Sequence, residues 1–370
     1  MTSRPLTVMH INTERGWRGG ERQTLWLAQG LERAGHRSLL VVRPGQPLAE
    51  RAADAGLEII PSAPGSEVDL AAARWIRRAI LANDVDIVHA HTAHAVALAA
   101  MGARRTPARM VLTRRTVFQL RSNPFTRWKY RRASAMIAIS ERVKEALVEG
   151  GMSAATIEVI PSGVPPDREV APAARAELGV PDDAPLVAMV GALAREKDPV
   201  TFVRAVAAAR ERVRDLRALL VGDGPLRSAV EAEIERLGIS DALRLTGHRV
   251  DADAIIMAAD ILALSSVEEG LGSVLLDAMA FAKPVVATDA GGIPEAVVHE
   301  VTGLIVPSGD AQAMGEAIAR VASDRELAAR LAAGARERAP RYSMDEVVRR
   351  TAALYERVLS GSRSGSRGTR

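Results

Sequence analysis

The sequence from Ser265 to Glu295, SSVEEGLGSVLLDAMAFAKPVVATDAGGIPE, decides the fold of this chain. An apolar run at 261–263 leads into an acidic pair and a Gly-Leu-Gly loop, followed by an apolar segment at 274–282 and a second apolar run at 284–287. This order predicts a strand, a loop, a helix and a second strand. Two strands joined through a helix run parallel, so the stretch indicates an α/β fold.

The loop within this stretch has the composition of a phosphate-binding site. Gly270 and Gly272 let backbone N–H groups approach a ligand, and the amino terminus of the next helix carries a partial positive charge. Glu269 can accept hydrogen bonds from sugar hydroxyl groups, and Asp277, about two helical turns later, can hold a ribose diol. The same residues also fit an ordinary tight turn followed by a solvated aspartate.

Strands and helices alternate on both sides of this stretch. In the first half we expect strands at 6–12, 38–42, 87–90, 110–113 and 135–140, with helices at 22–34, 71–83 and 93–103. In the second half we expect strands at 186–190, 218–221, 244–246, 261–263, 284–287 and 303–306, with helices at 200–212, 225–237, 274–282, 311–336 and 344–359. The alternation predicts two parallel sheets with helices on both faces.

Chain length and proline placement predict two domains. A chain of 370 residues exceeds what one hydrophobic core usually supports. Prolines at 160–166 and 180–185 interrupt the alternation, so we expect domains at 1–165 and 184–343 with a hinge at 166–183. A last helix at 344–360 precedes a Ser/Gly/Arg-rich tail, 361–370, that we expect to be disordered.

Composition excludes several classes of site and location. The chain has no cysteine, which rules out disulfides, thiolate metal sites and cysteine nucleophiles. No apolar run approaches the roughly 18 residues that span a bilayer, and residues 1–13 lack signal-peptide features. We therefore expect a cytoplasmic protein. Residues 1–165 carry a net charge of +9 and residues 166–370 a net charge of −5, unlike a uniformly basic nucleic-acid binder.

Taken whole, residues 265–295 resemble the donor-binding signature of family 4 retaining glycosyltransferases of the GT-B fold. In that signature two glutamates are separated by seven residues; here the pattern is Glu269-Gly-Leu-Gly-Ser-Val-Leu-Leu-Asp277-Ala-Met-Ala, with aspartate in second place. The resemblance implies two Rossmann-like domains with parallel sheets facing across a cleft. It also implies a last helix that crosses back to the first domain, and metal-independent transfer, with retention, from a nucleotide-diphosphate sugar, expected to be UDP-linked.

The resemblance also implies a role for each donor-site residue. Glu269 would face the sugar and Asp277 the ribose, while the amides of Gly270, Leu271, Gly272 and Ser273 would hold the distal phosphate. The segment Gly191-Ala-Leu-Ala-Arg-Glu-Lys197 resembles a loop whose arginine and lysine neutralise the diphosphate. Lys197 matches that lysine, Ala192 stands in the arginine position, and Arg195 is the nearest replacement. Gly222 and Val250 lie in two further matching loops, of which the second contacts the base.

In the first half, Trp17-Arg-Gly-Gly-Glu-Arg-Gln23 resembles the family segment that lines the cleft between sugar and acceptor. The resemblance assigns Gly19, Gly20 and Glu21 to the acceptor side of the cleft. For Glu21 the alternative is a plain strand-to-helix turn. Arg114 and Arg115 stand where many relatives carry a histidine, which suggests an anionic acceptor group. These features are similar to members that extend lipopolysaccharide core or other lipid-linked glycans.

The motif His89-Ala-His91 places two imidazoles on one face of a strand end. Zinc would need a third ligand, and the sequence shows none, so we expect His91 to line the acceptor cleft and expect no metal. No cofactor is expected beyond the nucleotide-sugar substrate.

Residues 87–140 contain ten basic residues and no acidic one, and aromatic residues lie among the basic ones at 104–132. Such a surface suits anionic lipid headgroups, so the protein is expected to lie at the inner face of the cytoplasmic membrane. A nucleic-acid patch and a solvated basic face are alternatives, and we expect no nucleic-acid partner. The expected partners are a nucleotide-sugar donor and a glycan or lipid-linked acceptor.

Two other functions fit the same fold. Ala192, Asp277 and the missing histidine favour a non-catalytic nucleotide-sugar-binding or scaffold protein. A nucleotide-sugar 2-epimerase shares the architecture but needs further acid–base carboxylates, and the Glu269 to Asp277 signature argues against it.

Overall fold

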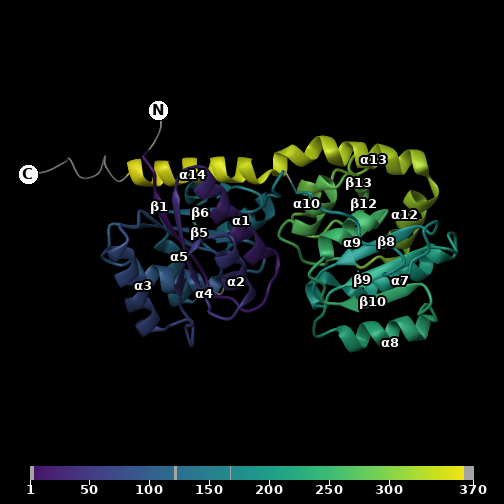
Figure 1. The fold of residues 1–370 in the computed structure, drawn as a ribbon, viewed down its shortest axis with the longest axis horizontal. Coiled ribbons are helices and arrows are strands. Elements are labelled where there is room, and N and C mark those ends of the chain that lie inside the picture. The colour runs from purple at the N-terminus through teal and green to yellow at the C-terminus, as the bar shows by residue number, and fades with distance from the viewer. Residues whose placement is uncertain (1–3, 121–122, 167, 362–370) are drawn as a thin grey trace, which may run out of the picture. The chain divides into compact units, whose positions relative to one another are not determined.

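The structure is a computed structural model that describes residues 4–120, 123–166 and 168–361 (Figure 1). The expected tail, apart from Gly361, lies outside these residues, as does Arg121 of the basic segment. The chain divides into two compact units. Unit 1 contains residues 1–165 and 344–370, and unit 2 contains residues 166–343. Within the described residues no helix is both long and apolar enough to cross a membrane.

Unit 1 is built on a seven-stranded sheet in which every neighbouring pair of strands is parallel. The strand order is β3-β2-β1-β4-β5-β6-β7. The strands are β1 (Thr7–Asn12), β2 (Arg37–Val42), β3 (Glu58–Pro61), β4 (Ile87–Ala90), β5 (Arg109–Arg114), β6 (Ala135–Ala138) and β7 (Ile157–Val159). The strands β3 and β7 lie at the two edges of the sheet and each has only one buried residue, so neither has the continuous apolar run by which the other strands were predicted.

Helices cover both faces of this sheet. They are α1 (Gly19–Arg33), α2 (Pro47–Asp54), α3 (Leu70–Ala82), α4 (Ala93–Gly102), α5 (Pro124–Arg131), α6 (Glu141–Glu149) and the last helix α14 (Met344–Ser360). Helix α14 packs on α1, and the side chains of Met344, Val347, Val348, Leu354 and Tyr355 enter the unit 1 core. The last helix therefore belongs to the unit that contains the first strand.

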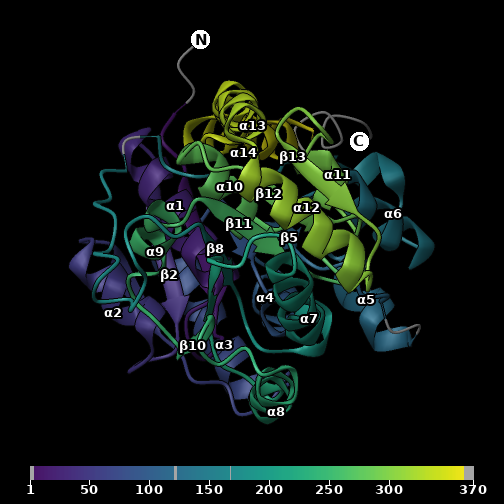
Figure 2. The same ribbon diagram turned by 90° about the vertical axis from the view of Figure 1, so that its right-hand side faces the viewer.

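Unit 2 is built on a six-stranded parallel sheet in the order β10-β9-β8-β11-β12-β13. The strands are β8 (Leu186–Val190), β9 (Arg217–Val221), β10 (Leu243–Gly247), β11 (Ile261–Leu264), β12 (Val285–Thr288) and β13 (Gly303–Val306). The helices are α7 (Pro199–Arg210), α8 (Arg227–Leu237), α9 (Ala252–Ala258), α10 (Ser273–Ala280), α11 (Ile293–Ala296), α12 (Ala311–Ser323) and α13 (Arg325–Arg338). Helices α7 and α12 pack together on one face, while α9 and α10 lie on the other (Figure 2).

The structure differs from the sequence prediction in further respects, because helices α2, α5, α6, α9 and α11 were not predicted. The expected single helix at 311–336 is two helices, because Asp324 ends α12 and its side chain accepts a hydrogen bond from the Leu327 amide to cap α13. Residues of the expected hinge pack in unit 2, where Leu178 and Val180 are buried in its core.

The two strand orders confirm the predicted α/β class with two Rossmann-like sheets. In each sheet the chain reverses direction across the sheet after its first strands, between β1 and β4 in unit 1 and between β8 and β11 in unit 2. Ligands of open parallel sheets bind at the carboxyl ends of the strands near such a point. These two places are where the predicted site residues lie.

Candidate functional site

In unit 2, Glu269 lies in the loop between β11 and α10, and the backbone packing around this loop requires glycine. Gly291 has a φ of +55°, and a Cβ atom there would lie 1.9 Å from the backbone oxygen of Glu269. The Gly292 amide donates to the same oxygen at 3.0 Å. The loop ends at Gly272, which has a φ of +81° and forms the N-cap of α10 without a capping side chain. Glycines therefore fix the position of Glu269.

Lys197 forms an ion pair with the Glu269 carboxylate. Lys197 lies in the loop after β8, the strand that pairs with β11, so both residues leave the carboxyl edge of the sheet. Ser265 joins the two loops, because its hydroxyl donates to the backbone oxygens of Lys197 at 3.0 Å and Asp198 at 2.8 Å. The Lys197 and Glu269 side chains are 21% and 13% exposed, so the pair is partly open to solvent.

The other phosphate-loop residues differ in what they can contribute. Leu271 is buried in the core, so only its backbone can face a ligand. Gly270, Gly272 and Ser273 lead into α10, whose first amides have no intrahelical acceptor. Arg195 is exposed, and no side-chain partner for it is found in the part of the chain that the structure describes. Its guanidinium is thus available to an anion.

Gly191, Gly222 and Val250 follow the carboxyl ends of β8, β9 and β10. Gly222 has a φ of +146°, and a Cβ atom there would lie 1.8 Å from the Gly191 oxygen, so these two loops touch through their backbones. The Val250 side chain is 82% exposed, which is unusual for a residue of its size. The three neighbouring strand ends thus form one edge.

Asp277 lies on α10 as predicted, but its carboxylate is occupied within the protein. It is 1% exposed, and Arg168 pairs with its Oδ1 atom at 2.6 Å. The same guanidinium pairs with Asp253 and lies 5.1 Å above the Phe281 ring. No sequence pattern marked Arg168 or Asp253, since both contacts join positions far apart in the chain.

In unit 1, Glu21 lies at the start of α1 and is 5% exposed. Its carboxylate accepts from the Arg18 amide at 3.0 Å and from Asn12 at 3.4 Å. Burial raises the pKa of this carboxyl group. Glu21 therefore stabilises the start of the helix. A Cβ atom built on the neighbouring Gly20 would lie 3.7 Å from the Arg115 side chain. Gly19 is the first residue of α1.

The structure distinguishes the two arginines that the sequence left equivalent. Arg114 donates to the Thr116 and Phe118 oxygens at 3.1 and 2.6 Å and to the Tyr130 hydroxyl at 3.2 Å, so it holds its own loop. Arg115 donates to Ser162 at 3.3 Å, but its buried Nε atom has no partner among the described residues. Burial lowers the pKa of Arg115 to about 10, with the Glu21 charge opposing this shift. Arg115 is the better candidate for an anionic ligand.

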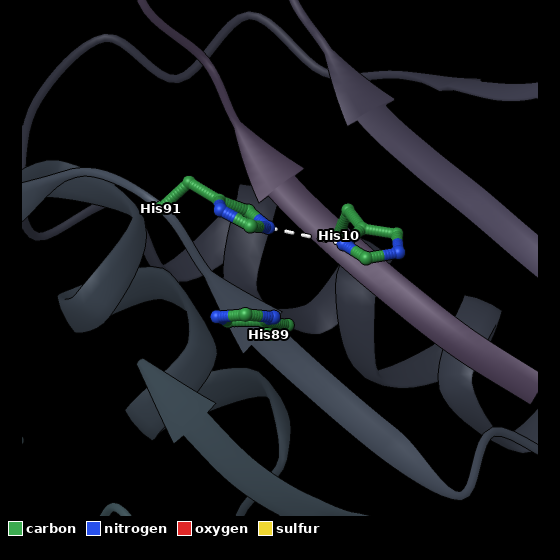
Figure 3. Close-up of side chains that lie close together, drawn as sticks. All are labelled: His10, His89 and His91. Atoms are coloured by element: carbon green, nitrogen blue, oxygen red, sulfur yellow. Dashed lines mark hydrogen bonds between the residues drawn. The ribbon is translucent and has the colours of Figure 1, made fainter. Parts of the chain in front are cut away.

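The third imidazole that the sequence did not reveal is His10. It lies on β1 directly beside His89 of β4, and its Nδ1 atom is 3.0 Å from Nε2 of His91 (Figure 3). One ring nitrogen from each histidine lies within 4.8 Å of the others. All three are buried, and burial lowers the pKa of each, to about 3 for His10. The three rings are therefore neutral near pH 7.

Three neutral imidazoles can bind zinc, but this arrangement has other partners. His89 contacts the Tyr355 hydroxyl at 2.6 Å through Nδ1 and the Thr113 hydroxyl at 2.7 Å through Nε2. The rings of His89 and His91 lie one over the other with centroids 4.1 Å apart, whereas metal ligands point their nitrogens at a common centre. The positive charge of Arg115 acts on both rings. The geometry therefore favours hydrogen bonding through His89, while the buried Nε2 atom of His10 and Nδ1 atom of His91 have no partner among the described residues.

Comparison with known proteins places both units in related families. Residues 17–168 match Glycosyltransferase Family 4, and residues 170–338 match Glycosyl transferases group 1. The chain is 30% identical to a GDP-mannose-dependent alpha-(1-6)-phosphatidylinositol monomannoside mannosyltransferase of Mycobacterium tuberculosis, over 74% of this chain and 75% of that protein. It is 35% identical to the lipopolysaccharide core biosynthesis glycosyltransferase LpsD of Rhizobium meliloti, over 46% and 48% of the two chains.

A solved structure, Anabaena HepE in complex with UDP-glucose, superimposes with a TM-score of 0.83 at 21% identity, covering 95% of this chain and 99% of that one. Other curated relatives match over only part of their length. The chain spans 64% of a 2-deoxystreptamine glucosyltransferase of Streptomyces kanamyceticus, to which it is 33% identical over 64% of its own length. The chain spans about half of the length of two further relatives, 47% of one and 45% of the other.

Proposed function

The chain belongs to glycosyltransferase family 4, and from this membership we propose that it transfers a sugar, with retention, from a nucleoside diphosphate sugar to a glycan or lipid-linked acceptor. One observation carries the proposal. Lys197 and Glu269, which leave neighbouring strands, form an ion pair beside the uncapped amino terminus of α10. This arrangement offers a cation, backbone amides and a carboxylate within one small region.

The chemistry of each group follows from where charge develops. When the bond between the sugar and the diphosphate breaks, negative charge grows on the leaving phosphate, and positive charge grows on the sugar ring. Lys197, the first amides of α10 and the exposed Arg195 can stabilise that phosphate without a metal ion. When Lys197 turns to the phosphate, Glu269 is released from its ion pair and can accept hydrogen bonds from sugar hydroxyl groups.

The donor is proposed to be UDP-linked. The support is the match in fold to a protein solved with UDP-glucose, together with loops at Gly191, Gly222 and Val250 that lie at the same sheet edge as Lys197. Base identity depends on the loop at Val250, where an exposed apolar side chain adjoins backbone amides.

The acceptor is proposed to carry an anionic group and to be linked to lipid. Asn12, His91 and Arg115 lie at the carboxyl ends of the neighbouring strands β1, β4 and β5, and Arg115 keeps a buried donor without a partner among the described residues. Relatives named for a phosphatidylinositol mannoside and for lipopolysaccharide core support this acceptor class.

The basic segment 104–132 supports a position at an anionic membrane, with one correction to its composition. Arg127, Arg131 and Arg132 are exposed beside Trp128 and line a surface hollow of about 560 Å³. Lys129 does not belong to that surface, because it is 4% exposed and pairs with Glu67. Replacing the three arginines, and not Lys129, is the appropriate test of lipid binding.

Nucleotide binding tests the donor site directly. UDP, GDP, ADP and their sugar conjugates are titrated by calorimetry into the wild type, Lys197→Ala and the matched surface variant Lys144→Ala, with and without magnesium. We expect one nucleoside diphosphate to bind selectively. Losing the Lys197 contact should cost on the order of 1.5–3 kcal/mol, roughly 10- to 150-fold in affinity, because the bond is charge-assisted. Lys144 pairs with Glu141 on α6 and should not matter.

Sugar transfer is then measured for Glu269→Ala, with nucleotide binding as the check that the variant is folded. We expect transfer to be lost while the nucleoside diphosphate still binds. Wild-type transfer by Glu269→Ala would exclude the assigned site. If the wild type binds the donor but neither transfers the sugar nor slowly hydrolyses the donor, the protein is a non-catalytic nucleotide-sugar-binding protein. Ala192 and the Arg168–Asp277 pair favour that alternative.

A further inference from the structure

Helix α3 of unit 1 presents large apolar side chains to solvent. Its inner face is conventional, since Ala73, Ile76 and Ile80 are buried. On the outside, Leu70 is 58% exposed, Trp75 48% and Leu81 50%, and Val68 just before the helix is 53% exposed. These are four of the ten large hydrophobic residues that are exposed in the described structure. Clustered exposure of this kind marks an interaction surface.

The same helix is strongly basic. Its sequence, LAAARWIRRAILA, contains Arg74, Arg77 and Arg78 and no acidic residue. All three arginines are exposed, and none forms an ion pair within the described parts of the chain. An exposed basic helix without neutralising partners attracts an anionic surface.

The carboxylates nearest the start of the helix are already engaged. Glu67 pairs with Lys129 of α5. Asp69 is the N-cap, and its carboxylate accepts from the Ala72 and Gly65 amides at 2.9 and 3.0 Å, which lowers its pKa. Neither carboxylate is directed at the arginines, so the outer face of α3 stays positive.

The arginines and the apolar residues share one face. At about 3.6 residues per turn, Leu70, Arg74, Arg78 and Leu81 follow one another along the outer side, with Trp75 beside them. Leucine and tryptophan next to arginine is the composition of helices that lie in the headgroup region of a membrane, where the long arginine side chains reach lipid phosphates.

Helix α3 is linked to the basic helix α5 through α4 and through one ion pair. It packs against α4, which contacts α5, and the Glu67–Lys129 ion pair joins the segment before α3 to α5 directly. Helix α5 exposes Arg127, Trp128 and Arg131, and its C-cap residue Arg132 is also exposed. Two helices of unit 1 that both pack against α4 therefore have the same combination of arginine and exposed aromatic side chain.

We propose that α3 is a membrane-binding helix that lies flat on an anionic bilayer, with Leu70, Trp75 and Leu81 in the interface and Arg74, Arg77 and Arg78 on lipid phosphates. The proposal deepens the proposed function, because it rests on an acceptor held in a membrane. A second copy of the chain is a poorer occupant: a twofold contact through α3 would bring two rows of unpaired arginines together.

The test uses the full chain and sedimentation with two kinds of vesicle: equal parts phosphatidylcholine and phosphatidylglycerol, or phosphatidylcholine alone. The charge variant is Arg74→Gln, Arg77→Gln and Arg78→Gln together. Its control carries the same charge change on α13 of unit 2, at the exposed Arg325, Arg330 and Arg336. A basic residue near an anionic surface strengthens binding by roughly fivefold, so the α3 variant should lose about a hundredfold and the control little.

Insertion is tested separately. In Leu70→Gln, Trp75→Gln and Leu81→Gln together, we expect weaker vesicle binding than in a variant with Val148→Gln and Val301→Gln, two exposed valines on other elements. Brominated lipid should quench the tryptophan emission of the wild type more than that of Trp75→Phe, since Trp75 would lie at the boundary between headgroups and acyl chains.

Several results would overturn the proposal: no binding of anionic vesicles by the wild type, unchanged binding in both α3 variants, or equal losses in the α13 control. A dimer in solution that the α3 variants dissociate would assign the face to self-association. Tighter binding to RNA than to vesicles, lost in the charge variant, would assign it to nucleic acid. Nucleoside diphosphate binding, measured on the same samples, reports on unit 2 and so tests the proposed function independently.

Discussion

At the scale of single residues, the site in unit 2 contains two ion pairs that differ in their exposure to solvent. The Lys197–Glu269 pair is partly exposed and can be opened by an incoming phosphate. The Arg168–Asp277 pair is different, because Asp277 is 1% exposed and Arg168 contacts a second carboxylate on Asp253. The first pair is therefore suited to exchange partners, and the second is suited to hold structure.

Replacing Arg168 should destabilise unit 2. In Arg168→Met, Asp277 stays buried without its cation, and removing one partner of a buried pair costs about 3–5 kcal/mol. The free energy of unfolding is measured with urea. The control is Arg212→Met, whose pair with Glu316 is 61% and 47% exposed and should contribute less than about 1 kcal/mol. Equal stability of both variants would show that the Asp277 carboxylate does not depend on Arg168.

At the scale of elements, unit 1 joins strands β1 and β4 to helix α14 through buried histidines. His10 pairs with His91 (Figure 3). His89 contacts Tyr355 of α14 and Thr113 of β5. Burial lowers the pKa of each histidine, so protonation of these rings destabilises the folded state. These elements are held together by hydrogen bonds that require neutral rings.

Acid should therefore destabilise unit 1 below the pKa of an unfolded histidine. The folded pKa is lower than the unfolded value of about 6.5, so the stabilisation is present above pH 6.5 and is lost as the pH falls. For His10, with a folded pKa of about 3, the loss is about 2 kcal/mol by pH 5. His89 and His91 act in the same direction.

Urea unfolding of unit 1 at several pH values checks this expectation. His10→Gln should reduce the slope of stability against pH, whereas the exposed His94→Gln on α4 should leave the slope unchanged. A stability of the wild type that is flat between pH 7 and pH 5 would contradict the pKa shifts.

At the scale of the whole molecule, two cores are built from a chain that passes from unit 1 to unit 2 and back. The crossings lie at Pro165–Pro166 and at Ser343–Met344. Helix α14 completes the unit 1 core, where Tyr355 is fully buried and Gly30 of α1 packs against Val348. The cooperative unit of unit 1 thus includes both ends of the described chain.

Truncation after Ser343 should unfold unit 1 and spare unit 2. Helix α14 buries Met344, Val347, Val348, Leu354 and Tyr355, and at about 1.5–3 kcal/mol each their loss is on the order of 10 kcal/mol, comparable to the whole stability of a domain. Scanning calorimetry should show that one of two transitions disappears. Truncation after Ser360 is the control, and two surviving transitions in the shorter chain would refute the assignment of α14 to unit 1.

Periodic patterns explain what could be predicted. Parallel strands buried on both faces, such as β8 and β11, appear as continuous apolar runs, and Gly-Leu-Gly before an apolar helix predicts a phosphate loop. The fold class followed from these local features, whereas the family followed from the resemblance of residues 265–295 to a known donor-binding signature. Whether Glu269, Lys197 and the remaining site residues act as assigned stays a prediction for the binding and transfer experiments.

What the sequence by itself determined was therefore the order of elements, the two parallel sheets and the glycine-rich loop, because each depends on neighbouring residues and a backbone period. Only the tertiary structure decided which side chains meet. It brought His10 to His89 and His91, joined Arg168 to Asp277, engaged Arg114 in its own loop while leaving Arg115 a buried donor, and turned Lys129 inward. These contacts join residues far apart in the chain, where no periodicity relates one position to the other and only packing selects the partner.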